Sequence, residues 1–214
     1  MKEIRLTLSI PCFGRPERTK RSIDCINNQD TNGWEAFIMG DCCPHFQNLI
    51  DSGYLESIKL EQEKKGNIIH YFNAETNGGG CGYKLTNHAI SNASGKYFMF
   101  YSNDDIILPN HFTNYLEIEK TDLDFMYFNT WVDPRSEVRN SLLEYGHIGH
   151  SEIIVKTELA KKITSHNERY GHDWDFIDEM GRLGKGDKSQ SENITYKVMS
   201  ITNYGEIITK ETID

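Results

Sequence analysis

The stretch Lys96-Tyr97-Phe98-Met99-Phe100-Tyr101-Ser102-Asn103-Asp104-Asp105 joins an apolar run directly to a pair of carboxylates. Large aromatic and apolar residues favour a buried strand over residues 96–101. Pro109 suits the first turn of a helix that would reach about residue 120. The sequence therefore predicts acidic side chains at the carboxyl end of a buried strand.

Strand and helix patterns alternate along the rest of the chain. Helical spacing predicts helices at 16–26, 54–65, 81–94 and 173–183. Apolar runs predict strands at 6–10, 34–40, 68–72, 125–131, 152–155, 196–201 and 207–208. This alternation indicates an α/β fold, in which ligands bind outside the carboxyl ends of parallel strands. Asp41 and Asp104 would both lie at that edge.

Length and charge narrow the class of protein. At roughly 150 residues per domain, 214 residues fit one elaborated domain, 1–214. The 23 basic and 32 acidic residues give a net charge of −9, which disfavours a nucleic-acid partner. No apolar run approaches the roughly 18–20 residues of a membrane span, and the amino terminus does not resemble a signal peptide, so we expect a cytoplasmic protein. Five cysteines without C-x-x-C spacing predict reduced thiols.

A glycine-rich loop at Asn77-Gly78-Gly79-Gly80-Cys81-Gly82-Tyr83-Lys84 precedes one predicted helix. It matches neither the phosphate loop of nucleotide triphosphatases nor the G-x-G-x-x-G dinucleotide pattern. Its backbone N–H groups could still approach a diphosphate at the helix start, while an ordinary turn fits the residues equally well.

Three further segments each have a structural and a chemical interpretation. Asn103-Asp104-Asp105 is either a polar turn or a source of hard oxygen ligands for Mg²⁺ or Mn²⁺. His172-Asp173-Trp174-Asp175 either compensates the dipole at a helix start or carries a general base. His147 and His150 lie three residues apart without a third metal ligand in sequence, which favours a loop near a substrate.

Together these segments resemble the nucleotide-sugar glycosyltransferases of the GT-A fold, particularly inverting family two, over roughly residues 4–185. Residues 8–15, Leu-Ser-Ile-Pro-Cys-Phe-Gly-Arg, are similar to the opening strand and nucleotide loop of that family. Residues 38–41 resemble its second strand, which ends in a uracil-contacting Asp, and 77–87 resemble its glycine loop and helix. Residues 102–109 are similar to its metal-binding D-x-D segment, and 172–175 to its E-D-W-D element with the catalytic base.

The resemblance implies a single GT-A domain with a mixed, mainly parallel central sheet flanked by helices. Residues 1–110 would bind the nucleotide sugar and 111–214 the acceptor. It also implies a UDP-sugar donor, a glycan acceptor, Mn²⁺ or Mg²⁺ as cofactor, and Asp173 as catalytic base. The implied nucleotide-binding residues are Pro11, Cys12, Phe13, Arg15, Asp41, Gly80, Lys84, Asn103 and Asp104; the implied metal ligands are Asp104 and Asp105; the implied acceptor contacts are Trp131, His150 and His172.

The chain departs from the family pattern at three places. Ser102 or Asn103 stands where D-x-D has its first acid, and His172 stands where the family has Glu. Leu85-Thr86-Asn87 replaces the usual Ala-Arg-Asn, which leaves Lys84 as the nearest cation for a phosphate. Two alternatives stay open: a sugar-phosphate nucleotidyltransferase, whose glycine-rich loop is absent after Ile10, and a non-catalytic module that binds sugar nucleotides or glycans.

Overall fold

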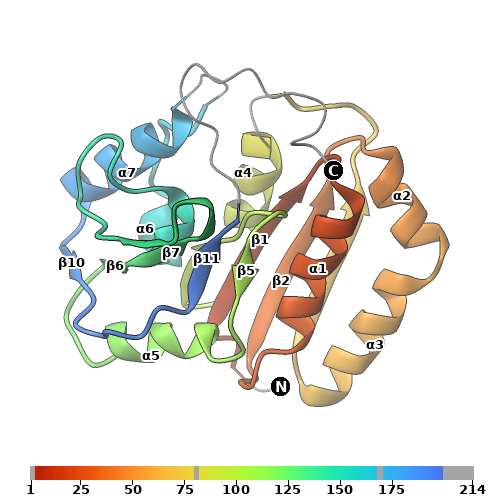
Figure 1. Cartoon of the computed structure of the whole chain (residues 1–214), viewed down its shortest axis with the longest axis horizontal. Helices are drawn as coiled ribbons and strands as arrows, with labels where there is room; N and C mark the ends of the chain where they lie inside the picture. Colours follow the sequence, from red (N-terminus) through yellow and green to blue (C-terminus); the bar gives the residue numbers. More distant parts are fainter. Residues whose placement is uncertain (1–2, 80–81, 168–170, 200–214) are drawn as a thin grey trace.

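A computed structural model describes residues 3–79, 82–167 and 171–199 of the chain (Figure 1). Within these ranges one sheet contains seven strands in the order β10-β6-β9-β4-β1-β2-β3. The strands are β1 (Leu6–Cys12), β2 (Trp34–Gly40), β3 (Ile68–Asn73), β4 (Tyr97–Phe100), β6 (Phe125–Tyr127), β9 (Ile153–Lys156) and β10 (Gly186–Lys188).

Most neighbouring strands of this sheet are parallel. β1 lies parallel to both β2 and β4, and β2 lies parallel to β3. The strand β9 runs antiparallel to β4 and β6, which makes the sheet mixed. The predicted fold class, an α/β domain with a mixed and mainly parallel central sheet, is therefore confirmed.

Helices cover both faces of the sheet (Figure 1). They are α1 (Pro16–Asn27), α2 (Pro44–Asp51), α3 (Tyr54–Lys65), α4 (Tyr83–Asn92), α5 (Asn114–Ile118), α6 (Thr157–Ala160) and α7 (His172–Leu183). Side chains of α1, α2, α3 and α5 pack in one buried cluster, and those of α4, α6 and α7 pack in the other.

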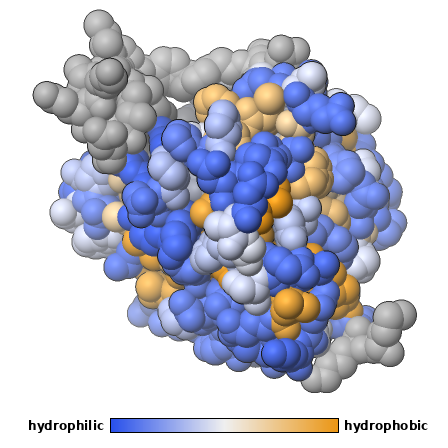
Figure 2. Space-filling model, turned by 90° about the vertical axis from the view of Figure 1, so that its right-hand side faces the viewer, coloured by the Kyte–Doolittle hydropathy of each residue, from blue (hydrophilic) through white to orange (hydrophobic). Residues whose placement is uncertain are grey.

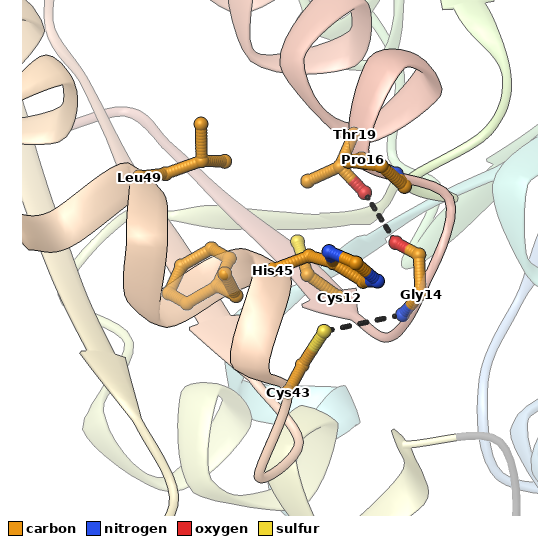
Figure 3. Close-up of a pocket in the computed structure, with 8 residues that line it drawn as sticks. Cys12, Gly14, Pro16, Thr19, Cys43, His45 and Leu49 are labelled. Carbon is orange, nitrogen blue, oxygen red and sulfur yellow. Dashed lines mark hydrogen bonds between the residues drawn. The ribbon is translucent and has the colours of Figure 1, made fainter. Parts of the chain in front are cut away.

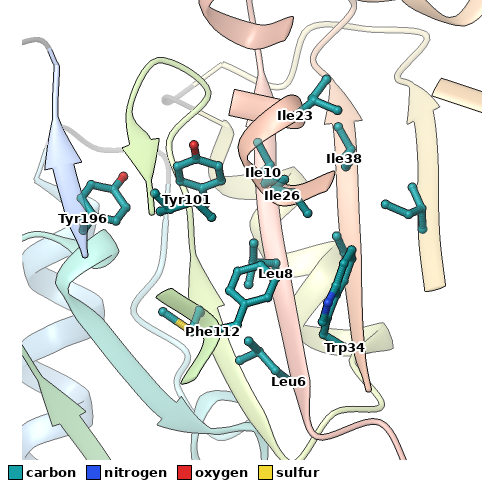
Figure 4. Close-up of a cluster of buried hydrophobic side chains, with 14 of the residues drawn as sticks. Leu6, Leu8, Ile10, Ile23, Ile26, Trp34, Ile38, Tyr101, Phe112 and Tyr196 are labelled. Carbon is teal, nitrogen blue, oxygen red and sulfur yellow. The ribbon is translucent and has the colours of Figure 1, made fainter. Parts of the chain in front are cut away.

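Alternation along the central strands produces these two clusters. Leu6, Leu8 and Ile10 of β1 enter the first cluster, where Figure 4 shows them along one strand together with Trp34 and Phe112. Phe98 and Phe100 of β4 enter the second cluster, whereas Tyr97 and Met99 between them enter the first. Because successive side chains of a strand point to opposite faces, a continuous apolar run fills two cores.

The prediction of one strand over residues 125–131 is wrong, because two separate strands lie there. The chain leaves the first sheet after β6, and β7 (Thr130–Val132) belongs to a second sheet with the order β5-β11-β7-β8. The other strands there are β5 (Ile106–Ile107), β8 (Glu137–Arg139) and β11 (Tyr196–Val198). The turn at 128–129 is fixed by tertiary contacts: Phe128 N donates to Glu152 O at 3.0 Å, and Ser141 N donates to Asn129 Oδ1 at 3.1 Å.

The helix predicted from Pro109 to about residue 120 is also wrong in extent. A short 3₁₀ turn, η2 (His111–Thr113), precedes the five-residue α5. Distant residues engage this segment, since Phe112 N donates to Gln29 Oε1 at 3.1 Å and Asn114 Nδ2 donates to Thr195 Oγ1 at 2.8 Å. The helix α2 was not predicted, and the predicted strand at 207–208 lies outside the described residues.

The face formed by α2 and α3 is mostly hydrophilic, with small apolar patches (Figure 2). Leu60 of α3 is exposed there, whereas Leu55 and Ile58 are buried against the sheet. Among the described residues, no helix is both long and apolar enough to cross a membrane.

Candidate active site

Asp41 directly follows β2, and hydrogen bonds to the end of β1 and to the glycine loop hold it in place. Its backbone N–H donates to Cys12 O at the end of β1, at 2.9 Å. Its side-chain Oδ1 accepts a hydrogen bond from Gly78 N, at 2.6 Å. The carboxyl ends of β1 and β2 and the glycine loop therefore meet at this buried carboxylate.

Gly78 lies close to both Asp41 and Lys84. A Cβ atom on Gly78 would lie 3.3 Å from both Asp41 Oδ1 and Lys84 Cδ. The backbone of Gly82, at the start of α4, has φ +81° and lies so close to Pro11 that a Cβ would sit 2.5 Å from the proline Cβ. The structure thus brings Pro11, Asp41 and Lys84 to one edge of the sheet, while Gly80 lies outside the described residues.

Asp104, after β4, forms an ion pair with Arg15 from the loop after β1. Ser102 Oγ donates to Asp104 Oδ1 at 2.5 Å, and Arg21 Nη2 donates to the Asp104 carbonyl at 2.6 Å. Neighbouring Asn103 donates through Nδ2 to Thr19 Oγ1, at 2.7 Å. Two basic side chains from the first loop and helix therefore hold the segment that resembles D-x-D, and Arg21 was not among the predicted residues.

Asp105 has a different environment from Asp104. Its Oδ2 accepts a hydrogen bond from Tyr196 OH at 2.7 Å, and its Oδ1 accepts one from Met199 N at 2.8 Å. Burial and the charge of Asp104 raise the pKa of Asp105 to about 7, although these hydrogen bonds oppose the rise. Asp105 was predicted to bind a metal ion, but both of its carboxylate oxygens already accept hydrogen bonds from β11 and the residue after it.

The loop after β1 borders a small hollow between α1 and α2 (Figure 3). Gly14 N donates to Cys43 Sγ at 3.2 Å, and Thr19 Oγ1 donates to Gly14 O at 3.3 Å. Cys12 is buried, and burial raises the pKa of its thiol well above the usual range. Phe13, by contrast, is 58% exposed. Of these predicted residues, Cys12 can offer only backbone atoms to a ligand, whereas Phe13 presents its ring.

Asp173 lies in the first turn of α7, and its side chain is 48% exposed. Its Oδ1 lies 3.3 Å from His172 Nε2 and 3.8 Å from His150 Nδ1. The exposed carboxylate is accessible to an acceptor hydroxyl, while its two histidine neighbours are largely buried. The structure thus brings the predicted residues His150, His172 and Asp173 together.

The start of α4 links these two groups of residues. Tyr83 places its ring centroid 6.5 Å from that of His172, and the adjacent Lys84 lies beside Gly78, whose N–H donates to Asp41. Further contact comes from Asn87, whose Nδ2 donates to His166 O at 3.1 Å. One helix terminus therefore joins the strand-end carboxylates to the start of α7.

Two aromatic residues that were not predicted, Trp174 and Tyr145, lie near Asp173. Trp131 lies in β7 of the second sheet, where its Nε1 donates to Asp133 Oδ1 at 3.3 Å. Trp174, next to Asp173, makes an edge-to-face contact with Tyr145 at 5.9 Å between centroids. Tyr145 is 61% exposed. Tyr145 lies in a loop without a helix or strand pattern, so the sequence did not indicate that it contacts Trp174.

The donor set at Asp104 suits a hard divalent cation. Its carboxylate and the Ser102 hydroxyl supply oxygen atoms, which Mg²⁺ and Mn²⁺ prefer, and an ion bound there would take the place of Arg15 at Oδ2. Two protein oxygens leave most of an octahedral shell for water and phosphate oxygens. The residues present therefore fit a cation that binds together with a diphosphate.

Solved structures with the same arrangement define the class of fold. Staphylococcus aureus TarS 1-349 in complex with UDP-GlcNAc aligns with a TM-score of 0.75 at 15% identity, covering 94% of this chain and 60% of that one. The mannosyltransferase PcManGT from Pyrobaculum calidifontis, in complex with GDP-Man and Mn²⁺, aligns with a TM-score of 0.63 at 12% identity, covering 92% and 57%. The fold is that of the GT-A glycosyltransferases.

Sequence comparison identifies the family. The family described as Glycosyl transferase family 2 matches residues 7–172, and the chain belongs to it. An uncharacterized glycosyltransferase of Rickettsia bellii is 32% identical over 113 residues, which are 53% of this chain and 15% of that protein. The putative colanic acid biosynthesis glycosyl transferase WcaA of Escherichia coli is 26% identical over 129 residues, 59% and 43% respectively. The chain thus spans less than half the length of these two relatives.

Proposed function

We propose that this chain transfers a sugar from a UDP-sugar to a hydroxyl of a glycan acceptor, with inversion at the anomeric carbon. The observation that carries the proposal is the meeting of Asp41, Lys84 and Asp104 at the carboxyl ends of parallel strands, linked through α4 to Asp173. Family membership supports sugar transfer, and the UDP-GlcNAc complex of TarS supports a uridine donor. In this proposal residues 1–110 bind the donor and residues 111–214 bind the acceptor.

The nucleotide contacts divide between the base and the diphosphate. Asp41 would accept a hydrogen bond from the uracil, beside Pro11 and the exposed Phe13 ring. Lys84 would pair with the diphosphate, whose negative charge also suits the N–H groups at the start of α4. A Mn²⁺ or Mg²⁺ ion held by Asp104 would stabilise the charge that develops on the departing diphosphate.

Asp173 supplies the general base in this mechanism. Its carboxylate accepts the proton of the acceptor hydroxyl as that oxygen forms a bond to the anomeric carbon and the bond to the diphosphate breaks. The carboxylate is half-exposed on the acceptor side, beside His150 and His172. Tyr145 and Trp174 would pack against the apolar face of the acceptor sugar.

Arg15 supports an alternative in which the site binds the diphosphate without a metal ion. Because its guanidinium already pairs with Asp104, Arg15 could supply the cation for the diphosphate without a metal. In that case UDP would bind equally well in Mn²⁺ and in chelator, and Arg15→Met would weaken binding more than Asp104→Asn.

A panel of nucleotide sugars tests the function. The chain is incubated with UDP-, GDP- and dTDP-sugars, and release of the nucleoside diphosphate is measured with and without candidate glycan acceptors. We expect release from a UDP-sugar that an acceptor accelerates, and a product with inverted anomeric configuration. Release of inorganic diphosphate from UTP and a sugar phosphate would indicate a nucleotidyltransferase instead. Binding of the sugar nucleotide without turnover would indicate a binding module.

A further inference from the structure

Three histidine rings from separate segments of the chain lie close together beside Asp173. His150 begins the 3₁₀ turn η4 (His150–Glu152), His166 follows α6, and His172 begins α7. One ring nitrogen of each lies within 4.8 Å of the others. The rings are largely buried, and His150 stacks on Phe100 with centroids 4.4 Å apart. The fold therefore holds three imidazoles around one point.

The hydrogen atom on His166 can be placed from its contact with Asn87. Asn87 Nδ2 donates to the His166 carbonyl, so its Oδ1 is the acceptor that faces His166 Nδ1, at 2.8 Å. His166 Nδ1 must therefore carry the hydrogen. In the neutral ring Nε2 then carries a lone pair, and this is the nitrogen that faces His172.

The same reasoning applies to His172. Its Nε2 lies 3.3 Å from Oδ1 of Asp173, an ion-pair distance that favours a hydrogen on Nε2. Its Nδ1 lies 2.8 Å from His166 Nε2. With the hydrogen of His172 on Nε2, two neutral rings would present lone pairs to each other, and a positive charge between the two nitrogen atoms would remove this repulsion. Either a proton or a metal ion can supply that charge.

His150 supplies the third nitrogen. Its Nδ1 faces Asp173 at 3.8 Å, and its Nε2 is buried without a hydrogen-bond partner in the part of the chain that the structure describes. A buried polar atom without a partner is costly, and a ligand would remove that cost. Each of the three rings thus has one nitrogen directed at an oxygen atom and a second nitrogen available to a common ion.

We propose that His150, His166 and His172 bind a divalent transition metal of the Zn²⁺ type, at a site separate from the carboxylates near Asp104. Three imidazoles with an open fourth position suit Zn²⁺, and a zinc-binding histidine usually donates its other N–H to an amide or carboxylate oxygen. Asn87 and Asp173 take that second role here. The metal would lie next to the proposed base Asp173, but its binding does not require the transfer reaction.

The spacing of the ring nitrogens agrees with this site. Bonds of about 2.0–2.1 Å in a tetrahedral zinc site separate its ligand atoms by roughly 3.4 Å. That value lies between the 2.8 Å separation of His166 and His172 and the 4.8 Å limit of the cluster.

Titration of the metal-free chain with Co²⁺ tests the site, because tetrahedral Co²⁺ absorbs visible light. We expect an absorption band that saturates near one equivalent and disappears when Zn²⁺ is added. His166→Gln and His150→Gln should remove the band, and Asn87→Ala should weaken affinity by about 10–100-fold. His147→Gln, an exposed histidine in the loop before His150, and Asp104→Asn serve as controls that should retain the band.

The outcomes separate this proposal from its alternatives. A band retained in His166→Gln, or lost in Asp104→Asn, would overturn the three-histidine site. If the histidine variants do not fold, X-ray absorption of the zinc-loaded wild-type chain decides the question. Three nitrogen ligands at about 2.0 Å are expected, and a shell of oxygen ligands alone would contradict the proposal. Neither measurement uses a nucleotide sugar, so failure of the proposed transferase would leave its result unchanged.

Discussion

At the scale of single residues, the surroundings of each carboxylate distinguish its proposed role. Asp41 is fixed by Gly78, Asp104 pairs with Arg15, and Asp105 accepts hydrogen bonds from Tyr196 and Met199. Sequence reasoning singled out all three carboxylates, because each follows or lies near a predicted strand end. It could not assign their partners, since Arg15 and Asp104 are 89 positions apart and nothing local links them.

Asp173→Asn tests the catalytic base at this scale. The substitution nearly preserves shape but removes the basic carboxylate, so we expect turnover to fall by about 10²–10⁴-fold while the Kd for UDP stays within about twofold. Steady-state kinetics and calorimetry measure the two quantities. Asp178→Asn, an exposed position on the same helix that pairs with Arg182 at 3.1 Å, is the control. Near-normal transfer by Asp173→Asn would remove this residue from the mechanism.

At the scale of elements, local signals predicted the first half of the chain well. β2, α1 and α3 begin and end within a residue of their predicted bounds, and Pro16 marks the start of α1 in the sequence. The second sheet was not predicted. Its strands contain two or three residues each, and β5 pairs with β11 through residues about 90 positions apart, so their order depends on tertiary contacts.

Gly95→Ala tests how closely the turn before β4 packs on β1. A Cβ there would lie 2.7 Å from the backbone carbon of Leu6 and from Thr7 N, atoms of a central strand that cannot move aside. We expect a loss of about 1–3 kcal/mol in the free energy of unfolding, measured by urea denaturation. Gly149→Ala should have little effect, because a Cβ there would meet no atom of the described residues within 4 Å and the backbone φ is −123°. Equal stability of the two variants would show that the turn can relax.

At the scale of the whole molecule, one buried carboxylate ties three strands and a turn together. Glu35 of β2 accepts hydrogen bonds from Thr7 Oγ1 of β1 at 2.6 Å and from Ser94 N at 2.6 Å, and its Oε2 lies 3.4 Å from His70 Nε2 of β3. Burial alone would raise its pKa, but bonds from His70, Thr7 and Ser94 outweigh it and lower the pKa to about 2. The ionised Glu35 carboxylate thereby connects β1, β2, β3 and the turn at Ser94.

The lowered pKa of Glu35 predicts a defined loss of stability in acid. The ionised form is favoured in the folded chain, so its contribution is complete above the ordinary value of 4.5 and is lost as the pH falls toward 2. Glu35→Gln should lower the free energy of unfolding at pH 7 by about 1–3 kcal/mol and flatten its decline between those two values. Urea denaturation at several pH values measures both effects, with exposed Glu137→Gln as control. If the free energy of unfolding of Glu35→Gln declined with falling pH as steeply as that of the wild-type chain, other carboxylates would be responsible for the decline.

Calorimetric titration with UDP tests the central claim, that the strand ends form a metal-assisted nucleotide-diphosphate site. Asp104 and Ser102 supply too few oxygens to hold a cation firmly without phosphate oxygens, so UDP and Mn²⁺ should bind together better than either alone. We predict that UDP binds at least tenfold more tightly in Mn²⁺ than in chelator, that Asp104→Asn abolishes this difference, and that GDP binds more weakly than UDP. Equal UDP affinity in Mn²⁺ and in chelator would contradict the metal-assisted site, and failure of every nucleoside diphosphate to bind would contradict the donor site itself.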